Sequence, residues 1–271
     1  MLGSPIAHSL SPVLHRAAYA ELGLDWAYRA VECTEPELAA TLDRLGADPS
    51  YAGLSLTMPL KTAVLALLDD VEDLATKVGA VNTVLLGTRR RGLNTDVAGI
   101  AAALDELGVL RPERSVVLGA GGTARAALAA LLARHAESVT VLVRDPGRVG
   151  PLRGAAEAIG LTVDVARWER AGTVLAGADV VVATTPAAAF DELVSHGPAD
   201  PWPHGVPLLD VVYAPWPTRL AAAARASGAP VVGGLSVLVA QAAEQVQAMT
   251  GRTPPVAAMR AAGERALQQR A

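Results

Sequence analysis

The sequence predicts an α/β protein with two domains, one of them a doubly wound unit built on a parallel sheet. Its 271 residues exceed the size of most single domains. From residue 115 to about 232, short β-rich runs alternate with Ala/Leu-rich helical stretches, which is the pattern of parallel strands joined by helices. Hydrophobic residues make up 51% of the chain and aromatic residues only 3%, so a sizeable core must be packed mainly with Ala, Val and Leu.

The second domain is expected over residues 96–233. Its predicted strands are SVVLG, SVTVLV, LTVDVA, ADVVVATT, PLLDVVY and APVV, and its predicted helices cover 96–107, 122–134, 148–159 and 218–227. Strands buried on both faces have continuous rather than alternating apolar residues. Because these runs are of that kind, we expect a parallel sheet covered by helices on both faces.

The first domain is expected over residues 1–95 and has its own α/β pattern. Its predicted elements are a strand ending near Ile6, a helix over 12–22, a strand over 27–32, a helix over 36–45, a strand over 52–57, a helix from Lys61, and a hairpin formed by AVNTVLL and GLNT. Pro12, Pro36 and Pro59 stand near helix starts, where proline is tolerated. Helices over 236–249 and 256–269 follow the last strand of the second domain, so we expect residues 234–271 to complete the first.

Charge and cysteine content argue against several functional classes. The formal net charge is −4 and the basic cluster Arg89–Arg91 falls at the hairpin tip, so we expect no nucleic-acid surface. Cys33 is the single cysteine, which leaves no intramolecular disulfide and no cysteine-based metal site. The start, MLGSPIAHS, lacks the features of a signal peptide, and no apolar stretch is long enough to span a bilayer. We therefore expect a cytoplasmic protein that does not bind a membrane. Its expected partner is a small molecule and its expected state is a monomer or a homodimer, although nothing in the composition determines that state.

A glycine-rich turn in SVVLGAGGTARAAL lies directly between a strand and a helix. Gly119, Gly121 and Ala124 have the G-x-G-x-x-A spacing, in which glycine permits a tight turn and a close approach of the backbone to a pyrophosphate. The free N–H groups of the helix N-terminus favour an anion at the same place. The turn therefore favours dinucleotide binding by a Rossmann-like domain over an ordinary βα turn.

The choice of dinucleotide depends on the end of the next strand, VTVLVRDPGR. Arg144 and Arg148 would pair with the 2′-phosphate of NADP, whereas Asp145 would accept hydrogen bonds from the ribose of NAD. Because two cations outnumber one anion at this bend, NADP is the favoured cofactor. The presence of Asp145 keeps NAD as an alternative cofactor. A simpler interpretation is that all three are exposed loop charges.

Lys61, in SLTMPLK, is unusual because it and Lys77 are the only lysines among 23 basic residues. An arginine stays protonated, whereas a lysine ammonium can give up its proton. Ser9 and Ser11, in SPIAHSLSP, come just before a predicted helix start at Pro12, where two hydroxyls and the helix dipole would suit a carboxylate. The alternatives are a solvated Lys61, an N-capping Ser11 and a turn residue Ser9.

Six motifs together resemble the shikimate dehydrogenase family. They are GSPIAHSLSP, SLTMPLK, GAVNT, NTDVAG, GAGGTA and GLSVLVAQA; they follow the family order and extend over nearly the whole chain. The resemblance implies a two-domain α/β fold and NADP-dependent interconversion of shikimate and 3-dehydroshikimate, a step of aromatic amino-acid and chorismate biosynthesis. It also implies that Lys61 and Asp96 are the catalytic pair, without a metal.

The resemblance assigns binding roles to further positions that match the family motifs. Those implied to bind substrate are Ser9 and Ser11 at its carboxylate, and Thr57, Asn82, Tyr213 and Gln241 at the carboxylate or the ring hydroxyls. Those implied to contact NADP are Gly119, Ala120, Gly121, Gly122, Thr123, Arg144, Arg148, Thr184, Val211 and Gly234. From the residues alone simpler roles stay open: Asn82 and Thr83 capping a turn, Asp96 capping a helix, a packed Tyr213 and an exposed Gln241.

The sequence also departs from the usual family pattern. SLTMP replaces NVTVP, so Ser55 stands where asparagine is usual; VRD replaces NRT at the phosphate-binding bend, and ATTPA at 183–187 replaces NATSxG. The first strand of the family normally begins several residues before Met1, so the strand is short here or starts upstream. Competing functions are an NAD-dependent quinate/shikimate dehydrogenase and a non-catalytic nucleotide-binding regulator, which would need no proton donor.

Overall fold

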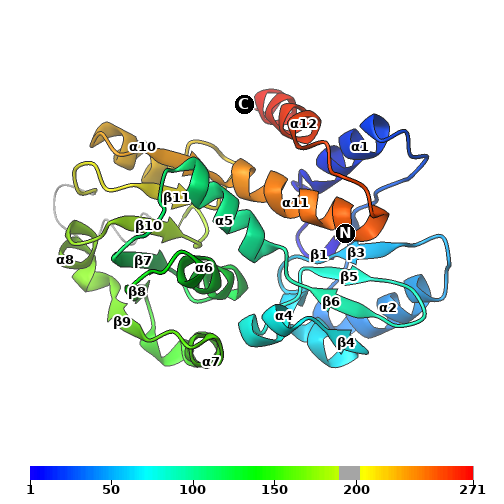
Figure 1. The fold of residues 1–271 in the computed structure, drawn as a ribbon, viewed down its shortest axis with the longest axis horizontal. Coiled ribbons are helices and arrows are strands. Elements are labelled where there is room, and N and C mark those ends of the chain that lie inside the picture. The colour runs from blue at the N-terminus through cyan, green and yellow to red at the C-terminus, as the bar shows by residue number, and fades with distance from the viewer. Residues whose placement is uncertain (189–201, 271) are drawn as a thin grey trace. The chain divides into compact units, whose positions relative to one another are not determined.

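The computed structural model describes residues 1–188 and 202–270. The chain divides into two compact units, the first made of Met1–Gly99 and Leu238–Ala271 and the second of Ile100–Val237 (Figure 1). Helix α5 (Asp96–Glu106) begins in the first unit and α11 (Gly234–Thr250) ends in it. Both units contain helices and strands, which confirms the prediction of a two-domain α/β protein.

The second unit is built on a six-stranded parallel sheet. Its strands are β7 (Arg114–Leu118), β8 (Ser138–Val143), β9 (Val163–Arg167), β10 (Val180–Ala183), β11 (Leu208–Asp210) and β12 (Val231–Gly233). They lie in the order β12-β11-β10-β7-β8-β9, with every pair parallel. Figure 1 labels the five strands from β11 to β9 in this order. The order reverses between β7 and β10, so the glycine-rich turn after β7 lies at the switch point, where open α/β sheets bind their ligands.

Apolar side chains of this sheet and its helices form the core of the second unit. The helices are α6 (Gly122–Ala133), α7 (Gly150–Ile159), α8 (Ala171–Ala176) and α10 (Arg219–Ala226), with one-turn 3₁₀ helices η3 (Pro146–Arg148) and η4 (Trp168–Arg170). Val116, Leu142, Val181 and Leu208 are among the buried strand residues. The continuous apolar runs were correctly assigned to strands: the inner strands β10 and β11 are buried on both faces, whereas the edge strands β9 and β12 are partly exposed.

The first unit contains a four-stranded sheet of order β3-β5-β6-β4 and a parallel pair, β1-β2. The strands are β1 (Leu2–Gly3), β2 (Val31–Glu32), β3 (Gly53–Ser55), β4 (Asp70–Val71), β5 (Thr83–Leu85) and β6 (Arg91–Leu93). A parallel bridge between Leu2 and Leu56 joins the pair to β3. The predicted hairpin is present as β5 and β6, which pair antiparallel.

The helices of this unit come from both ends of the chain. They are α1 (Ser11–Glu21), η1 (Glu35–Glu37), α2 (Leu38–Gly46), α3 (Leu60–Ala63), η2 (Val64–Leu67), α4 (Asp73–Val78), the C-terminal part of α11, and α12 (Val256–Gln268). Helix α12 packs against α1. The last two helices therefore complete the fold that the first 99 residues begin.

Three predicted elements of this unit differ from the structure, and one of them, the strand predicted over 27–32, is present only as β2, Val31–Glu32. The first strand ends at Gly3 and not near Ile6, because Pro5 has no N–H for a ladder. Gly3 itself lies so close to Thr57 that a Cβ would stand 2.2 Å from its methyl group. The helix predicted from Lys61 is α-helical only over Leu60–Ala63 and tightens into η2.

The described residues, 1–188 and 202–270, lack two kinds of feature. None of the helices there is long and apolar enough to cross a membrane. The same residues contain no group of three or more His, Cys, Asp or Glu side chains placed to hold a metal ion.

Candidate active site

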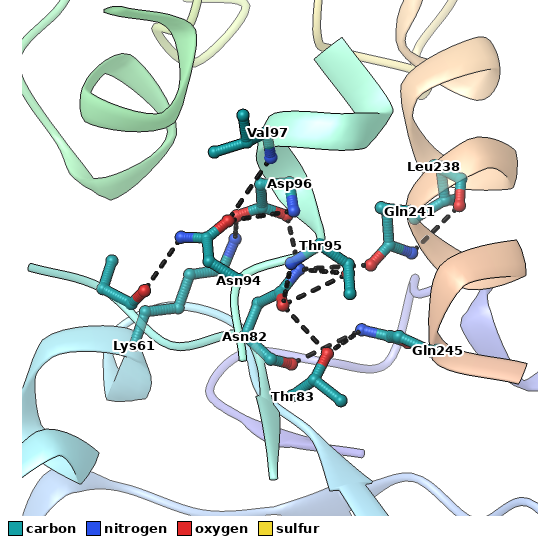
Figure 2. Close-up of polar contacts among 11 residues, drawn as sticks. Lys61, Asn82, Thr83, Asn94, Thr95, Asp96, Val97, Leu238, Gln241 and Gln245 are labelled. Atoms are coloured by element: carbon teal, nitrogen blue, oxygen red, sulfur yellow. Dashed lines mark hydrogen bonds and ion pairs between the residues drawn. The ribbon is translucent and has the colours of Figure 1, made fainter. Parts of the chain in front are cut away.

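Lys61 and Asp96 form an ion pair in the first unit. Lys61 is the second residue of α3 and Asp96 the first of α5, and Nζ lies 2.5 Å from Oδ2 (Figure 2). The two side chains are 18% and 9% exposed, so the pair is only partly screened by water. One of the three N–H donors of the ammonium serves this bond. The geometry suits a proton donor held in place by a carboxylate.

Asn94, and not Asp96, caps the start of α5. Its Oδ1 accepts the backbone N–H groups of Asp96 at 3.0 Å and Val97 at 3.3 Å, while its Nδ2 donates to the carbonyl of Ala80 at 2.8 Å. Because a neighbouring residue performs the capping, the Asp96 carboxylate is left for side chains. The simpler role considered for Asp96 is therefore wrong.

Asn82 connects this pair to the rest of the network. It is 1% exposed, and its Nδ2 donates to Asp96 Oδ1 at 2.8 Å and to Thr95 Oγ1 at 2.9 Å. Its Oδ1 accepts the Thr95 backbone N–H at 2.9 Å. Both Asp96 oxygens are thus engaged, one by Asn82 and one by Lys61, which fixes the plane of the carboxylate.

Gln241 approaches the same network from α11. Its Oε1 lies 3.4 Å from Asn82 Nδ2, and its Nε2 donates to the Leu238 carbonyl at 2.9 Å (Figure 2). It is buried, not exposed as the simpler interpretation had it. The structure therefore brings together Lys61, Asn82, Asp96 and Gln241.

Four residues of this network were not predicted as site residues: Thr83, Asn94, Thr95 and Gln245. A signal was available for Gln245, because it follows Gln241 by one helical turn and so lies on the same face of α11. It is 1% exposed and hydrogen-bonds Ser55 and Thr83. Nothing in the sequence alone distinguishes Thr95 from an ordinary loop residue.

The hydrogen bonds described for Ser9, Ser11 and Thr57 are made outside this network. Ser9 Oγ accepts the backbone N–H of Ser11 at 3.2 Å, and Ser11 is the first residue of α1. The N-cap of α1 is Leu10, so Ser11 is not the cap. Thr57 is held through its backbone, with its N–H on the Leu2 carbonyl at 3.0 Å. Tyr213 follows β11 in the second unit.

The glycine-rich turn of the second unit is shaped for a close approach. Gly119 has a φ of +104°, and a Cβ there would stand 2.8 Å from Thr184 Oγ1. Ala120 and Gly121 follow, and α6 begins with Gly122 and Thr123. The N-cap Gly121 has no side chain to satisfy the first N–H groups of this 12-residue helix, and the space beside its Cα is open. These residues fit the pyrophosphate of a dinucleotide.

In the bend after β8, Asp145 and the two arginines that flank it, Arg144 and Arg148, have different surroundings. Asp145 Oδ1 accepts the backbone N–H of Gly147 at 2.9 Å, so the carboxylate caps η3. The Arg144 guanidinium lies over the Trp168 ring, 5.9 Å from its centroid, and both Arg144 and Arg148 are exposed. The carboxylate thus has a local structural role, whereas the guanidinium groups lie at the surface.

Val211 and Gly234 lie against each other at the ends of β11 and β12. A Cβ on Gly234 would stand 2.0 Å from the Val211 carbonyl oxygen, so only glycine fits. Asp210 anchors this segment: its carboxylate accepts hydrogen bonds from Thr218 Oγ1 at 2.5 Å and from the Val212 N–H at 3.0 Å. Burial raises the pKa of Asp210, and these two hydrogen bonds partly oppose that effect.

Three family models match consecutive parts of the chain. Residues 1–84 match the shikimate dehydrogenase substrate binding domain, residues 101–193 match shikimate / quinate 5-dehydrogenase, and residues 234–262 match the shikimate 5'-dehydrogenase C-terminal domain. The matched regions include Lys61 and Asn82 in the first, the glycine-rich turn in the second and Gln241 in the third.

Individual relatives are similar over almost the whole chain. A shikimate dehydrogenase (NADP(+)) from Moorella thermoacetica is 37% identical over 265 residues, covering 96% of this chain and 90% of the relative. Shikimate 5-dehydrogenase from Thermus thermophilus, solved in complex with NADP(H) and shikimate, has a TM-score of 0.85 at 36% identity and 98% coverage of both chains. A quinate dehydrogenase from Corynebacterium glutamicum, solved in complex with NAD, has a TM-score of 0.83 at 32% identity and 96% coverage of both chains. The chain therefore belongs to the shikimate dehydrogenase family.

Proposed function

We propose that this protein is an NADP-dependent shikimate dehydrogenase, which reversibly reduces 3-dehydroshikimate to shikimate in aromatic amino-acid biosynthesis. The observation that carries the proposal is the Lys61–Asp96 pair, with Nζ 2.5 Å from Oδ2, in a chain that is 37% identical to a shikimate dehydrogenase (NADP(+)). The protein is an oxidoreductase acting on a CH–OH group. Such a biosynthetic enzyme would work in the cytoplasm, as a monomer or a homodimer.

Lys61 would be the acid and base of the reaction. When bound, NADPH supplies the hydride that reduces the carbonyl carbon. The carbonyl oxygen then needs a proton, which Lys61 Nζ would donate; in the reverse direction the neutral amine would take it from the hydroxyl. Asp96 would hold the ammonium through Oδ2 and accept a hydrogen bond from a ring hydroxyl of the substrate.

The remaining substrate contacts are proposed from the family motifs. Ser9 and Ser11 would hydrogen-bond the substrate carboxylate at the start of α1, where the helix dipole favours an anion. The polar side chains that would bind the carboxylate or the ring hydroxyls are those of Thr57, Asn82, Tyr213 and Gln241. In support, Asn82 and Gln241 are already oriented by the hydrogen bonds of the Lys61–Asp96 network.

The nucleotide would be held by the second unit. The residues that would contact it are Gly119, Ala120, Gly121, Gly122, Thr123, Arg144, Arg148, Thr184, Val211 and Gly234. Thr184 supports the turn, because its N–H and hydroxyl both donate to the Leu118 carbonyl, at 3.0 and 2.7 Å. The capping role of Asp145 favours NADP over NAD, since the carboxylate is already engaged with Gly147.

One assay separates this function from its alternatives. Nicotinamide absorbance would be followed with shikimate or quinate as the alcohol and NADP⁺ or NAD⁺ as the acceptor. We expect the highest kcat/KM for shikimate with NADP⁺. Preference for quinate with NAD⁺ would establish the quinate dehydrogenase instead, and nucleotide binding without turnover in any pairing would establish a regulator.

A further inference from the structure

Gln245 is a buried amide behind the Lys61–Asp96 network. It lies in α11, one turn after Gln241, and is 1% exposed. Its Oε1 accepts a hydrogen bond from Ser55 Oγ at 2.8 Å, and its Nε2 donates to Thr83 Oγ1 at 2.9 Å. The Asn82 carbonyl oxygen lies 3.4 Å from the same Nε2, which fixes which end of the amide carries the nitrogen.

The hydrogen bonds from Gln245 onward all run in one direction. Because Thr83 Oγ1 receives the Gln245 N–H, its own proton is directed to Asn82 Oδ1, 2.9 Å away (Figure 2). With Oδ1 accepting from Thr83 and from the Thr95 backbone N–H, Asn82 presents Nδ2 to Asp96 Oδ1 at 2.8 Å. The donors therefore follow the order Ser55, Gln245, Thr83, Asn82, and the last acceptor is the Asp96 carboxylate.

We propose that Gln245 is a positioning residue for the Lys61–Asp96 pair, and that it acts through Thr83, which helps the Thr95 backbone N–H to fix which end of the Asn82 amide meets Asp96. The role rests on the proposed function, because it concerns the proton-transfer step. If the Asn82 amide turned over, its oxygen would face the carboxylate and repel it. Asp96 would then lose one hydrogen bond and part of the constraint on its orientation toward Lys61.

The surroundings leave Gln245 little freedom. His15, whose electrostatic environment includes the Gln245 side chain, is completely buried, and its Nε2 has no hydrogen-bond partner among the described residues. His15 Nδ1 is 2.9 Å from the Ser11 carbonyl, so it carries the proton, and the ring stacks on Tyr28 with centroids 4.0 Å apart. Ser55 and Thr83 are directly opposite each other in the antiparallel pair of β3 and β5, and the Gln245 amide joins their two hydroxyls.

Steady-state kinetics with shikimate and NADP⁺ on the full chain test this role. Gln245→Leu and the isosteric Thr83→Val should each lower kcat about 5- to 10-fold, the effect of one hydrogen bond on the transition state. Thr83→Ser should recover most of the loss, and Ser55→Ala should cost less than Gln245→Leu because it acts one bond further away. Gln247→Leu, at an exposed position of the same helix, is the matched control and should leave kcat and KM unchanged.

A double-mutant cycle distinguishes positioning from loss of folded protein. In an Asn82→Ala background the amide is gone, so Gln245→Leu should cost less than 2-fold, whereas a general loss of folded enzyme would cost the same factor in both backgrounds. Equal costs in the two backgrounds would overturn the proposal. So would full activity of both Thr83→Val and Gln245→Leu in an active wild-type enzyme.

A crystal structure of Thr83→Val gives a readout that does not depend on turnover. In that variant only the Thr95 backbone N–H would still hold Asn82 Oδ1, so we expect the 2.8 Å contact between Asn82 Nδ2 and Asp96 Oδ1 to lengthen as the amide shifts. If the wild-type enzyme proves inactive with shikimate, the proposed function fails, and this structure still decides the orientation of Asn82. An unchanged Asn82 amide would refute the positioning role.

Discussion

At the scale of single residues, the two lysines of the chain lie in different surroundings. Lys61 is 18% exposed and paired with Asp96 in the buried network. Lys77 is 45% exposed and pairs with Asp73, four residues earlier on α4, as solvated helix charges commonly do. The two lysines therefore form a matched pair for testing whether proton transfer needs one specific ammonium.

Lys61→Ala should lose most of its turnover, because no other group would supply the proton. A general acid/base commonly contributes about 10²- to 10⁴-fold in rate, so we expect kcat to fall by that factor and KM for shikimate to change less. Lys77→Ala should keep wild-type kcat. Near-normal turnover of Lys61→Ala in the same absorbance assay would remove Lys61 from the mechanism.

His15 makes stability depend on pH. Burial lowers its pKa from 6.5 to about 4, so the folded protein holds the ring neutral. Between those pH values the unfolded chain binds the proton and the folded one does not. Stability from this residue is therefore present above pH 6.5 and is lost as the pH falls through 4. The loss between pH 7 and pH 5 should be about 2 kcal/mol.

The measurement is urea unfolding of the wild type and His15→Phe at both pH values. The phenylalanine keeps a ring against Tyr28 but cannot take up a proton. We expect the wild type to lose about 2 kcal/mol more than the variant between pH 7 and pH 5, whatever the difference between them at pH 7. Parallel losses in the two proteins would mean that His15 does not titrate in this way.

At the scale of elements, the bend formed by β8 and η3 should decide the choice of nucleotide. Arg144 and Arg148 flank Asp145, whose carboxylate caps η3. Replacing both arginines with alanine removes the cations that would pair with the 2′-phosphate. We expect KM for NADPH to rise about 10- to 100-fold, because losing charge-assisted hydrogen bonds to the 2′-phosphate costs about 1–3 kcal/mol. KM for NADH, which has no 2′-phosphate, should change little.

Asp145→Asn is the matched control, because asparagine can still cap η3 without its charge. The ratio of NADPH to NADH efficiency should stay within about 3-fold of the wild type, as expected for an exposed charge that makes no direct contact. A large gain in NADPH preference would instead show that Asp145 faces the ribose.

Elements with a long continuous pattern could be predicted from the sequence, and short ones could not. The inner strands of the second unit were found because burial on both faces leaves an uninterrupted apolar run. Helices α4 and α8 and strand β4 were missed, because two to six residues are too few for a period to show. The site residues differ in the same respect. A local motif identified Lys61, whereas Gln245 shares a helix face with Gln241 but was missed because its partner Ser55 is 190 positions away in the sequence.

At the scale of the whole molecule, the first and last helices of the chain belong to one unit. Helix α12 packs against α1, and it buries Met259 completely. Two arginines add to this: Arg252 donates to the Leu22 carbonyl at 2.9 Å, and Arg270 to the His8 carbonyl at 2.7 Å. The second unit, in contrast, is one continuous segment, Ile100–Val237. Loss of the C-terminal helix should therefore affect only one of the two functions of the enzyme.

A chain ending at Gly251 should unfold at a lower temperature and lose turnover, but still bind NADPH. Removing α12 exposes the face of α1 that it covered. The free energy of unfolding should fall by about 3 kcal/mol, the cost of exposing one large apolar side chain and its surroundings. For a chain of this length that corresponds to a fall in Tm of about 10 °C.

The affinity of the truncated chain for NADPH, measured by fluorescence titration, should stay within about 3-fold of the full chain, an energy well under 1 kcal/mol, because no residue of the second unit is removed. Arg270→Ala, which removes only an exposed hydrogen bond, should keep Tm within about 2 °C. An unchanged Tm in the truncated chain would show that α12 does not stabilise the unit that holds Lys61 and Asp96.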